Sequence, residues 1–306
     1  MTPSLPNPDR ATGRRRLWRI AGTVVLLVIA VLVVRNQVRV YRNRQARAAA
    51  AAVQQQRAAL EMPLRQALFE MLRPVALANC DLARFGEAND GGYLMCGNLL
   101  RDVRSGYSYG IAGYDKWGCD ISTALEVPVH QYDCFDTTRP ACVDATTIFH
   151  AECVADAART EQGRFFDTLA NQVMRNNDTS KRLVLKIDVE GAEWNTFLSA
   201  PDDLLEHIDQ MAVEFHWLQG GSTGWLHDEK YIAALRRLKQ FFEIAHVHFN
   251  NASCVGGLEP FPTWAFEVLL VSKRLAVVDP SRNIVGPHPL DAPNNPSFPD
   301  CQPGAR

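Results

Sequence analysis

The sequence lacks a strong excess of charge of either sign. Its 306 residues carry 32 Lys and Arg against 34 Asp and Glu, which gives a formal net charge of −2. Nucleic-acid partners are attracted by a basic excess, so the overall charge does not favour one and none is expected. The basic residues are unevenly distributed, however, because arginines are concentrated in residues 1–60.

Two patterns common at metal and cofactor sites are also missing. The eight cysteines include no C-x-x-C pair, so neither a zinc ribbon nor a thioredoxin-like site is predicted. The loop after the first predicted strand, "GIAGYDKWG", lacks the G-x-G-x-x-G spacing, which argues against a classical dinucleotide dehydrogenase. The even cysteine count leaves two interpretations open: buried free thiols, or disulfides in a domain outside the reducing cytosol.

One long uncharged apolar run stands out, the fifteen residues Ile20–Val34. As a helix it spans about 22 Å, somewhat less than the roughly 30 Å of a bilayer's hydrocarbon core. Adding Leu17 and Trp18, and letting the flanking arginines extend to the headgroups, closes most of that gap. We therefore predict a transmembrane helix over residues 17–35. A cleaved signal peptide is less favoured, because the small-x-small sequence at Ala46–Ala48 lies well beyond the apolar core.

The remaining organisation follows from composition. Residues 1–16 form a basic tail, and further arginines follow the apolar run, so the two flanks balance. The sequence thus predicts a single-pass membrane protein without deciding which side carries the globular domain. Residues 36–63 are rich in good helix formers and predict a helical stalk interrupted near Pro63. A single domain follows over residues 64–278, and residues 279–306 form a proline-rich irregular tail.

Within the domain, short apolar segments alternate with helical patterns. The predicted strands are Tyr107–Ile111, Val127–Tyr132, Thr146–His150, Leu183–Asp188, Ile208–Phe215, Phe241–Phe249 and Trp264–Val271. Apolar stripes predict helices over Arg164–Met174 and Asp228–Gln240. This alternation indicates an α/β fold with an open, mostly parallel, seven-stranded sheet and helices on both faces. No helical pattern separates the last two strands, which are expected to pair antiparallel at one edge.

Polar or glycine residues stand where three of these strands end. Gly110 lies at the end of the first predicted strand, Asp133 follows the second and Asp188 ends the fourth. Ligands of open α/β sheets lie beyond the carboxyl ends of the strands, so we expect these three residues to share one crevice. A polar ligand and water there would compensate for the carboxylates that follow a buried strand.

Each residue near these strand ends has a functional and a structural interpretation. Gly110 and Gly113 permit close approach of the backbone to a ligand, or simply form a turn. Asp133 is suited to accept the hydroxyls of a ribose, or to cap a turn. Glu152 faces either an adenine ring or solvent. The sequence Asp90-Gly91-Gly92 predicts a hairpin turn.

The segment "KIDVEGAEW" places several carboxylates after the most apolar strand. Asp188 and Glu190 are candidate catalytic residues, whereas Glu193 is explained by the dipole of the helix that it begins. Downstream, Glu214 and His216 project from one strand face, and a histidine beside a carboxylate can act as a general base or be a satisfied, partly buried histidine. A metal site from Asp188, Glu190 and His216 is chemically feasible, but the spacing is not diagnostic and no metal is predicted.

Together, "LKIDVEGAEW", "DGGY" upstream, "VHQYD" in the middle and "VEFH" downstream give the chain, from about Arg84 to Lys273, a resemblance to FkbM-type S-adenosylmethionine-dependent methyltransferases. The resemblance implies a Rossmann-like class I methyltransferase fold with an antiparallel final strand. It also implies cofactor beside the first strands: Gly110 and Gly113 near its methionine part, Asp133 at its ribose, and Asp188 near the transferred methyl group and the acceptor.

The family's first loop commonly combines glycines with an adjacent acidic residue, and "GIAGYDKWG" departs from that pattern, with Asp115 as the candidate substitute. An acidic crevice favours the sulfonium and ammonium groups of the cofactor. The resemblance implies O-methylation of a sugar or small molecule, with Asp188 or His216 as the base. Two other functions remain open: a membrane-tethered binding or scaffold domain without turnover, and a nicotinamide-dependent oxidoreductase.

Overall fold

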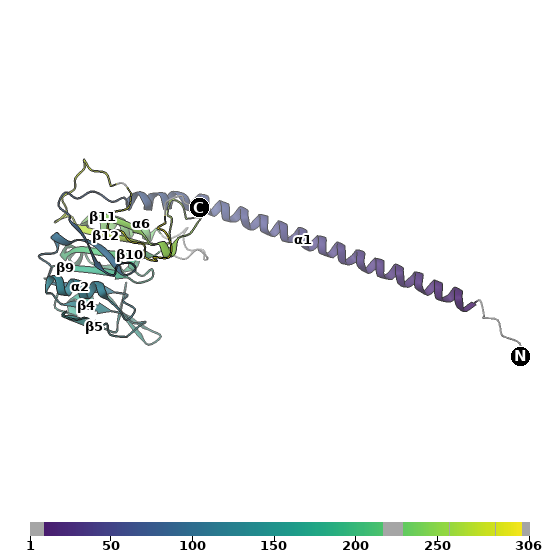
Figure 1. Ribbon diagram of the computed structural model, residues 1–306, viewed down its shortest axis with the longest axis horizontal. Helices are drawn as coiled ribbons and strands as arrows, with labels where there is room; N and C mark the ends of the chain where they lie inside the picture. Colours follow the sequence, from purple (N-terminus) through teal and green to yellow (C-terminus); the bar gives the residue numbers. More distant parts are fainter. Residues whose placement is uncertain (1–8, 217–228, 257, 285, 302–306) are drawn as a thin grey trace. The chain divides into compact units, whose positions relative to one another are not determined.

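The structure is a computed structural model of residues 1–306, and it describes the backbone of residues 9–216, 229–256, 258–284 and 286–301 (Figure 1). Side chains are described from residue 32 onwards within these ranges, except residues 54 and 57–61. The chain divides into two compact units, residues 1–60 and 61–306.

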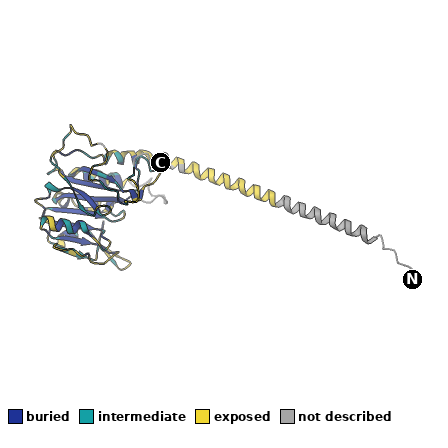
Figure 2. Cartoon of the chain, viewed as in Figure 1, coloured by how far each residue is buried: buried dark blue, intermediate teal, exposed yellow. Residues whose placement is uncertain are grey.

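The first unit consists of most of one helix, α1 (Asp9–Met71), which continues into the second unit. Its described side chains over residues 32–53 are exposed (Figure 2). The predicted interruption near Pro63 is wrong, because the helix continues through this proline. Proline removes one backbone hydrogen bond, but Leu68 and Leu72 are buried in the core of the second unit. Burial of such an apolar face can sustain a helix beyond a local defect.

The predicted transmembrane segment, residues 17–35, falls within α1. The side chains of residues 1–31 lie outside the described part of the chain, and so does the backbone of residues 1–8. Of the residues that are described, none forms a helix long and apolar enough to cross a membrane. The membrane span and the basic tail, residues 1–16, stay predictions.

The second unit is built on a seven-stranded sheet in the order β11-β12-β10-β9-β3-β4-β5. The strands are β3 (Ser105–Tyr109), β4 (Val129–Tyr132), β5 (Thr147–His150), β9 (Leu183–Asp188), β10 (Ile208–His216), β11 (Phe242–Phe249) and β12 (Ala265–Ser272). β5, β4, β3, β9 and β10 pair in parallel, whereas β12 pairs antiparallel with both β10 and β11. Every predicted strand is present with small shifts at its ends, and the antiparallel pair at one edge is confirmed.

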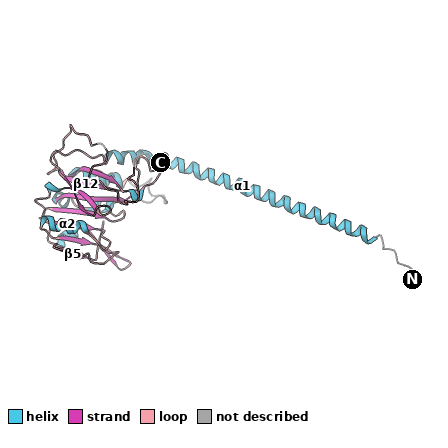
Figure 3. Cartoon of the chain, in the orientation of Figure 1, coloured by secondary structure: helices cyan, strands magenta, loops and turns pink. Residues whose placement is uncertain are grey.

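Both faces of this sheet pack into hydrophobic core clusters, and Figure 3 distinguishes its strands from the helices. The helices are α2 (Lys116–Leu125), α3 (Leu169–Arg175), α4 (Glu193–Ser199), α5 (Asp202–His207) and α6 (Lys230–Phe241), with 3-10 turns at η1 (Gly97–Leu99) and η3 (Asn251–Ser253). In β9, Leu185 packs into one core cluster with Trp194 of α4, and Val184 packs into the other with Ile121 of α2. Burial on both sides explains why β9 is apolar almost throughout.

The predicted helix Arg164–Met174 is wrong in its first half. A separate three-stranded sheet, in the order β6-β8-β7, contains β6 (Cys153–Ala155), β7 (Arg159–Glu161) and β8 (Arg164–Thr168). Phenylalanine and threonine favour strands, and two phenylalanines are followed by Thr168, whose hydroxyl accepts a hydrogen bond from Asn171 N at 3.2 Å. This cap starts α3 at Leu169.

The predicted helix Asp228–Gln240 corresponds to α6, although Asp228 itself lies outside the described residues. Its expected buried face is largely confirmed, since Tyr231, Leu235 and Leu238 are buried. Ile232 is only partly buried and packs at the margin of the core.

The predicted turn at Asp90-Gly91-Gly92 joins an antiparallel hairpin of β1 (Leu82–Gly86) and β2 (Gly92–Cys96). The described part of the tail, residues 279–284 and 286–301, has no regular helix or strand, as expected, and it is fastened to the unit. Asn251 Nδ2 donates to Asn295 O at 2.9 Å, and a disulfide joins Cys254 to Cys301. The tail therefore belongs to the compact unit.

All eight cysteines are paired, so of the two interpretations of the even cysteine count the structure adopts the disulfides. The pairs are Cys80–Cys96, Cys119–Cys142, Cys134–Cys153 and Cys254–Cys301. Disulfides of this kind persist in oxidising compartments and are rare in the cytosol.

Candidate functional site

A cavity of about 460 Å³ lies at the carboxyl ends of β3, β4 and β9. Gly110, Asp133 and Asp188 all line it, each from a different strand end, so the expected convergence of these ends on one crevice is confirmed. The strand order reverses between β3 and β9, and such a switch point is where ligands bind in open α/β sheets. Its wall also includes Tyr109, Tyr132, Phe135, Val154, Phe166 and Glu190.

A buried ammonium ties two of these strand ends together. Lys186, in β9, donates from Nζ to Gly110 O at 2.8 Å and to Tyr109 O at 3.2 Å. Its Nζ lies 3.5 Å from Asp188 Oδ2. Gly110 adopts a φ of +70°, a left-handed conformation that favours glycine. The loop after β3 is thereby held close to the end of β9.

Asp133 holds the loops that shape the cavity. Its Oδ2 accepts from the backbone N–H groups of Ile111 at 3.1 Å and Ala112 at 2.8 Å. Its Oδ1 accepts from those of Phe135 at 2.8 Å and Asp136 at 3.0 Å. A carboxylate has about four acceptor positions, so all of them are used by the backbone. The turn interpretation of Asp133 is therefore realised, while its ribose role stays a prediction.

Three other predicted residues do not line the cavity. Gly113 has a φ of +76° and packs beside Asp136. Glu152 forms an ion pair with Arg175. Asp115 is buried and caps α2, accepting from Gly118 N at 2.8 Å. Burial raises the pKa of Asp115, even though the charge of Lys186 and several hydrogen bonds lower it.

A second, smaller hollow of about 150 Å³ is lined by all three candidate catalytic residues, Asp188, Glu190 and His216. Asp188 and Glu190 line the larger cavity too. His216 Nε2 lies 3.7 Å from Asp188 Oδ1, 3.8 Å from Glu190 Oε2 and 3.8 Å from Glu214 Oε1. Glu214 and His216 do project from one face of β10, as predicted. Glu190 is mostly exposed and has a φ of +54°.

Glu193 is the residue whose role the sequence analysis missed. It is fully buried, and its Oε1 accepts from Val189 N at 3.0 Å and Gly191 N at 3.2 Å. The same oxygen lies 2.9 Å from His216 Nδ1. Its position at the start of α4 already had a sufficient explanation in the helix dipole, so the spacing gave no signal of this contact. Glu193 thus fixes the orientation of the His216 imidazole.

The charge of His216 reflects this setting. Burial lowers the pKa of the imidazole, but the hydrogen bond and charge of Glu193, followed by the charges of Glu214 and Asp188, raise it to about 9. Burial raises the pKa of Glu214 well above its ordinary value, and the charges of Asp188 and Glu267 raise it further. His216 therefore carries a proton at neutral pH.

Residues distant in sequence line the acidic hollow or donate hydrogen bonds to its carboxylates. Tyr93, in the hairpin strand β2, donates to Asp188 Oδ2 at 3.3 Å. Asn250 donates to Glu214 Oε1 at 2.7 Å. Asp90, in the hairpin turn, also lines the hollow. No sequence pattern links these residues to β9 and β10, because only the packing of the hairpin and of the loop after β11 brings them there.

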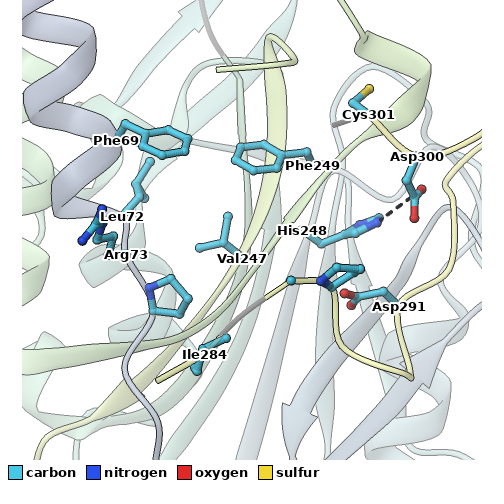
Figure 4. Close-up of a pocket in the computed structure, with 13 residues that line it drawn as sticks. Phe69, Leu72, Arg73, Val247, His248, Phe249, Ile284, Asp291, Asp300 and Cys301 are labelled. Carbon is cyan, nitrogen blue, oxygen red and sulfur yellow. Dashed lines mark ion pairs between the residues drawn. The ribbon is translucent and has the colours of Figure 1, made fainter. Parts of the chain in front are cut away.

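A further cavity, of about 490 Å³, lies at the edge strand β11 (Figure 4). The rings of Phe69 and Phe249 stack across it with centroids 6.2 Å apart. His248 Nε2 lies 3.7 Å from Asp300 Oδ1, the ion pair drawn in Figure 4. None of the predicted site residues lines this cavity, so it does not form part of the candidate site.

The candidate site therefore combines a cavity of nucleoside size with an acidic hollow, and the side chain of Asp188 borders both. The larger space is walled mainly by aromatic and aliphatic residues, and the smaller one mainly by carboxylates and His216. Comparison of the chain with protein-family models, with curated proteins and with solved structures gave no match.

Proposed function

We propose that residues 61–306 bind S-adenosylmethionine in the cavity at the ends of β3, β4 and β9 and transfer its methyl group to a hydroxyl acceptor. The observation that carries this proposal is the meeting of Gly110, Asp133 and Asp188 around one space of about 460 Å³. Such a volume lies within the roughly 300–1,000 Å³ typical of small-molecule sites.

The strand order supports the same proposal. β3, β4 and β5 run outward from the switch point on one side, and β9 and β10 run outward on the other. The last strand, β12, is inserted antiparallel between β10 and β11. A seven-stranded sheet with a reversed final strand is the arrangement that the resemblance to FkbM-type methyltransferases implies.

The chemistry of the lining residues suits this cofactor. Phe166, in β8, and the more exposed Phe135, just after β4, both line the cavity and lie edge to face with ring centroids 6.4 Å apart. An adenine ring gains from contact with such aromatic surfaces. Asp188 and Glu190 also line the cavity, and their negative charge favours a sulfonium or ammonium group.

Bound there, S-adenosylmethionine supplies an electrophilic methyl group: its S–CH₃ bond breaks as the acceptor O–CH₃ bond forms, and sulfur keeps the bonding electron pair. The protein has to align the acceptor oxygen with that bond and to take the hydroxyl proton. Asp188 is the best-placed base, because it borders both spaces. His216 is protonated at neutral pH, with a pKa of about 9, and is therefore a weaker candidate for this role.

The acidic hollow is the proposed entrance for the acceptor. Its carboxylates and Asn250 offer hydrogen-bond acceptors and donors suited to a polyhydroxyl compound. A sugar or another small molecule with several hydroxyl groups is therefore the proposed acceptor class. With the predicted membrane helix, the enzyme would act near a bilayer surface.

Calorimetry with S-adenosylmethionine and S-adenosylhomocysteine tests the proposal directly. We expect saturable binding of both to the folded, disulfide-intact chain. A folded protein that binds neither compound would remove the enzyme interpretation. Tighter binding of a nicotinamide dinucleotide than of S-adenosylhomocysteine would instead favour the oxidoreductase.

One observation favours a second function, a membrane-tethered binding domain without turnover. Four disulfides suit an oxidising compartment, whereas S-adenosylmethionine is made in the cytosol. Maleimide labelling after reduction, in intact and in lysed cells, shows on which side of the membrane the domain lies. Cofactor binding without methyl transfer to any of a panel of hydroxyl compounds would support this second function.

A further inference from the structure

The acidic hollow has the arrangement of a metal site as well as that of an acceptor entrance. Asp188, Glu214 and His216 each direct one donor atom into it, and these three atoms all lie within 4.8 Å of one another. They come from the ends of two adjacent parallel strands, β9 and β10, paired at Asp188 and Glu214. Their positions are therefore set by the sheet rather than by a flexible loop.

The histidine is the observation that separates this group from an ordinary acidic patch. His216 is 6% exposed, and its Nε2 faces oxygens of Asp188 and Glu214 at 3.7 and 3.8 Å. These distances are too long for hydrogen bonds. Among the described residues, no acceptor lies within hydrogen-bond distance of Nε2. The Nε2 atom of this buried side chain thus faces the hollow with no hydrogen-bond partner in the described part of the chain.

The other contacts of these side chains hold the donors in place. Glu193 Oε1 lies 2.9 Å from His216 Nδ1, the second nitrogen of the ring. Histidines that bind metals commonly have a carboxylate at this second nitrogen, which orients the ring. Asn250 donates to Glu214 Oε1 at 2.7 Å, and Tyr93 donates to Asp188 Oδ2 at 3.3 Å.

The charge balance of the hollow also favours a cation. Glu214 is 4% exposed and lies among other carboxylates, including Asp188 and Asp90. The nearby ammonium of Lys186 is largely engaged by two backbone oxygens. Buried carboxylates are costly unless paired or bound to a metal. A dication that replaces the proton on His216 Nε2 would bring one more positive charge to these carboxylates than that proton does.

We propose that Asp188, Glu214 and His216 bind a divalent transition-metal cation, such as Mn²⁺ or Zn²⁺, in the hollow beside the cavity. Two carboxylates with one imidazole suit these ions better than Ca²⁺ or Mg²⁺, which prefer oxygen donors alone. Donor atoms around a common ion lie roughly 3.0–3.5 Å apart, since each bond is about 2.1 Å long. The donors lie up to 4.8 Å apart, so the widest separation has to close by roughly 1.3–1.8 Å, a movement shared between two side chains.

Metal binding is a property of these side chains alone, so its test does not depend on whether the neighbouring cavity binds S-adenosylmethionine. The full chain, without an affinity tag, is freed of metal with a chelator under non-reducing conditions and titrated with Mn²⁺. Loss of the electron paramagnetic resonance signal of free Mn²⁺ measures binding. We expect one saturable site in the micromolar range.

Two variants with a matched control locate the ion. Glu214→Gln and His216→Gln are each expected to weaken Mn²⁺ binding at least about tenfold, or roughly 1.4 kcal/mol. Glu190→Gln removes an exposed carboxylate from the same hollow and is expected to weaken it less than about threefold. Equal losses of Mn²⁺ affinity in Glu190→Gln and Glu214→Gln would indicate that the hollow attracts the ion only through its overall negative charge. That result would overturn the proposal.

A spectroscopic measurement keeps the proposal testable if either variant fails to fold. Pulsed electron paramagnetic resonance of Mn²⁺ bound to the unmodified chain is expected to show coupling to one imidazole nitrogen. Bound Mn²⁺ without nitrogen coupling, or no saturable binding of either Mn²⁺ or Zn²⁺ at millimolar concentration, would overturn it.

Discussion

The backbone of Asp188 occupies the position that a side chain on Gly110 would need. A Cβ built on Gly110 would lie 1.6 Å from Asp188 O. Asp188 ends β9, Gly110 directly follows the neighbouring strand β3, and both line the candidate cofactor cavity. A residue without a side chain at position 110 is therefore a steric requirement of the site.

Gly110→Ala is expected to destabilise the domain by at least about 2 kcal/mol, because it combines backbone strain with a clash against main-chain atoms. Urea denaturation measures the change. The control is Gly163→Ala, since Gly163 has a similar φ of +78° but a Cβ on it would meet no atom within 4 Å. We expect that control to cost only about 1 kcal/mol. Equal destabilisation by Gly110→Ala and Gly163→Ala would contradict the role of the close contact between Gly110 and Asp188.

Asp133→Ala is expected to lower the free energy of unfolding by about 2 kcal/mol or more, because four backbone N–H groups would lose their acceptor. If Asp133 also contacts the ribose, the variant weakens cofactor affinity more than it changes the maximal rate. Asp102→Ala, at an exposed position, serves as the control and is expected to stay within about 0.5 kcal/mol. A larger effect on rate than on affinity would contradict the ribose role.

Asp188→Asn is expected to reduce turnover at least about tenfold, an effect of roughly 1.4 kcal/mol on the barrier, because an amide cannot accept the hydroxyl proton. Release of S-adenosylhomocysteine in the presence of sugar acceptors measures turnover. The thermal unfolding midpoint should change little, since asparagine keeps an oxygen for the contact with Tyr93. Unchanged turnover would refute the role of Asp188.

His130 on β4 and His150 on β5 form a pair, with Nδ1 of the first 3.0 Å from Nε2 of the second. This pair predicts a pH dependence of stability. Burial lowers the pKa of His150, and the charges of His130 and Arg175 lower it further, to about 4. The unfolded chain, with a histidine pKa near 6.5, therefore binds this proton more readily than the folded chain. The stabilisation is complete above about pH 6.5 and is lost as the pH falls towards 4.

His150→Gln removes this proton-binding group, so the difference in stability between pH 7 and pH 4 should shrink by roughly 1–3 kcal/mol. Urea denaturation across that range measures the difference, and His207→Gln, outside the pair, is the control. If the free energy of unfolding changed equally with pH in the His150→Gln variant and in the unmodified chain, His150 would not titrate as described.

The disulfide between Cys254 and Cys301 predicts a local effect of its removal. It closes a loop with a sequence separation of 47 residues, and chain-entropy arguments assign such a closure up to about 4 kcal/mol. The double variant Cys254→Ser/Cys301→Ser should lose part of this stability and expose the tail to proteolysis. If the double variant lost stability but its tail was not cleaved, the hydrogen bonds from Asn251 would suffice to hold the tail in place.

Local patterns were enough to predict the main sheet. Each strand is a short apolar run bounded by polar or turn residues, and both ends of β9 were predicted correctly. Residues 164–168 were wrongly predicted as helix. Phe165 and Phe166 fit the apolar stripe of a helix, but two adjacent phenylalanines are equally compatible with a strand. Only pairing with β6 and β7 decides between the two.

The sequence by itself determined the alternation of strands and helices, the hairpin at Asp90 and the placement of Asp133 and Asp188 at strand ends. Only the tertiary structure decided the disulfide pairing, the contact of Glu193 with His216, and the approach of Tyr93 to Asp188. The reason is physical: periodicity reports which side of an element is buried, whereas a contact between distant residues depends on strand order, register and the packing of neighbouring elements.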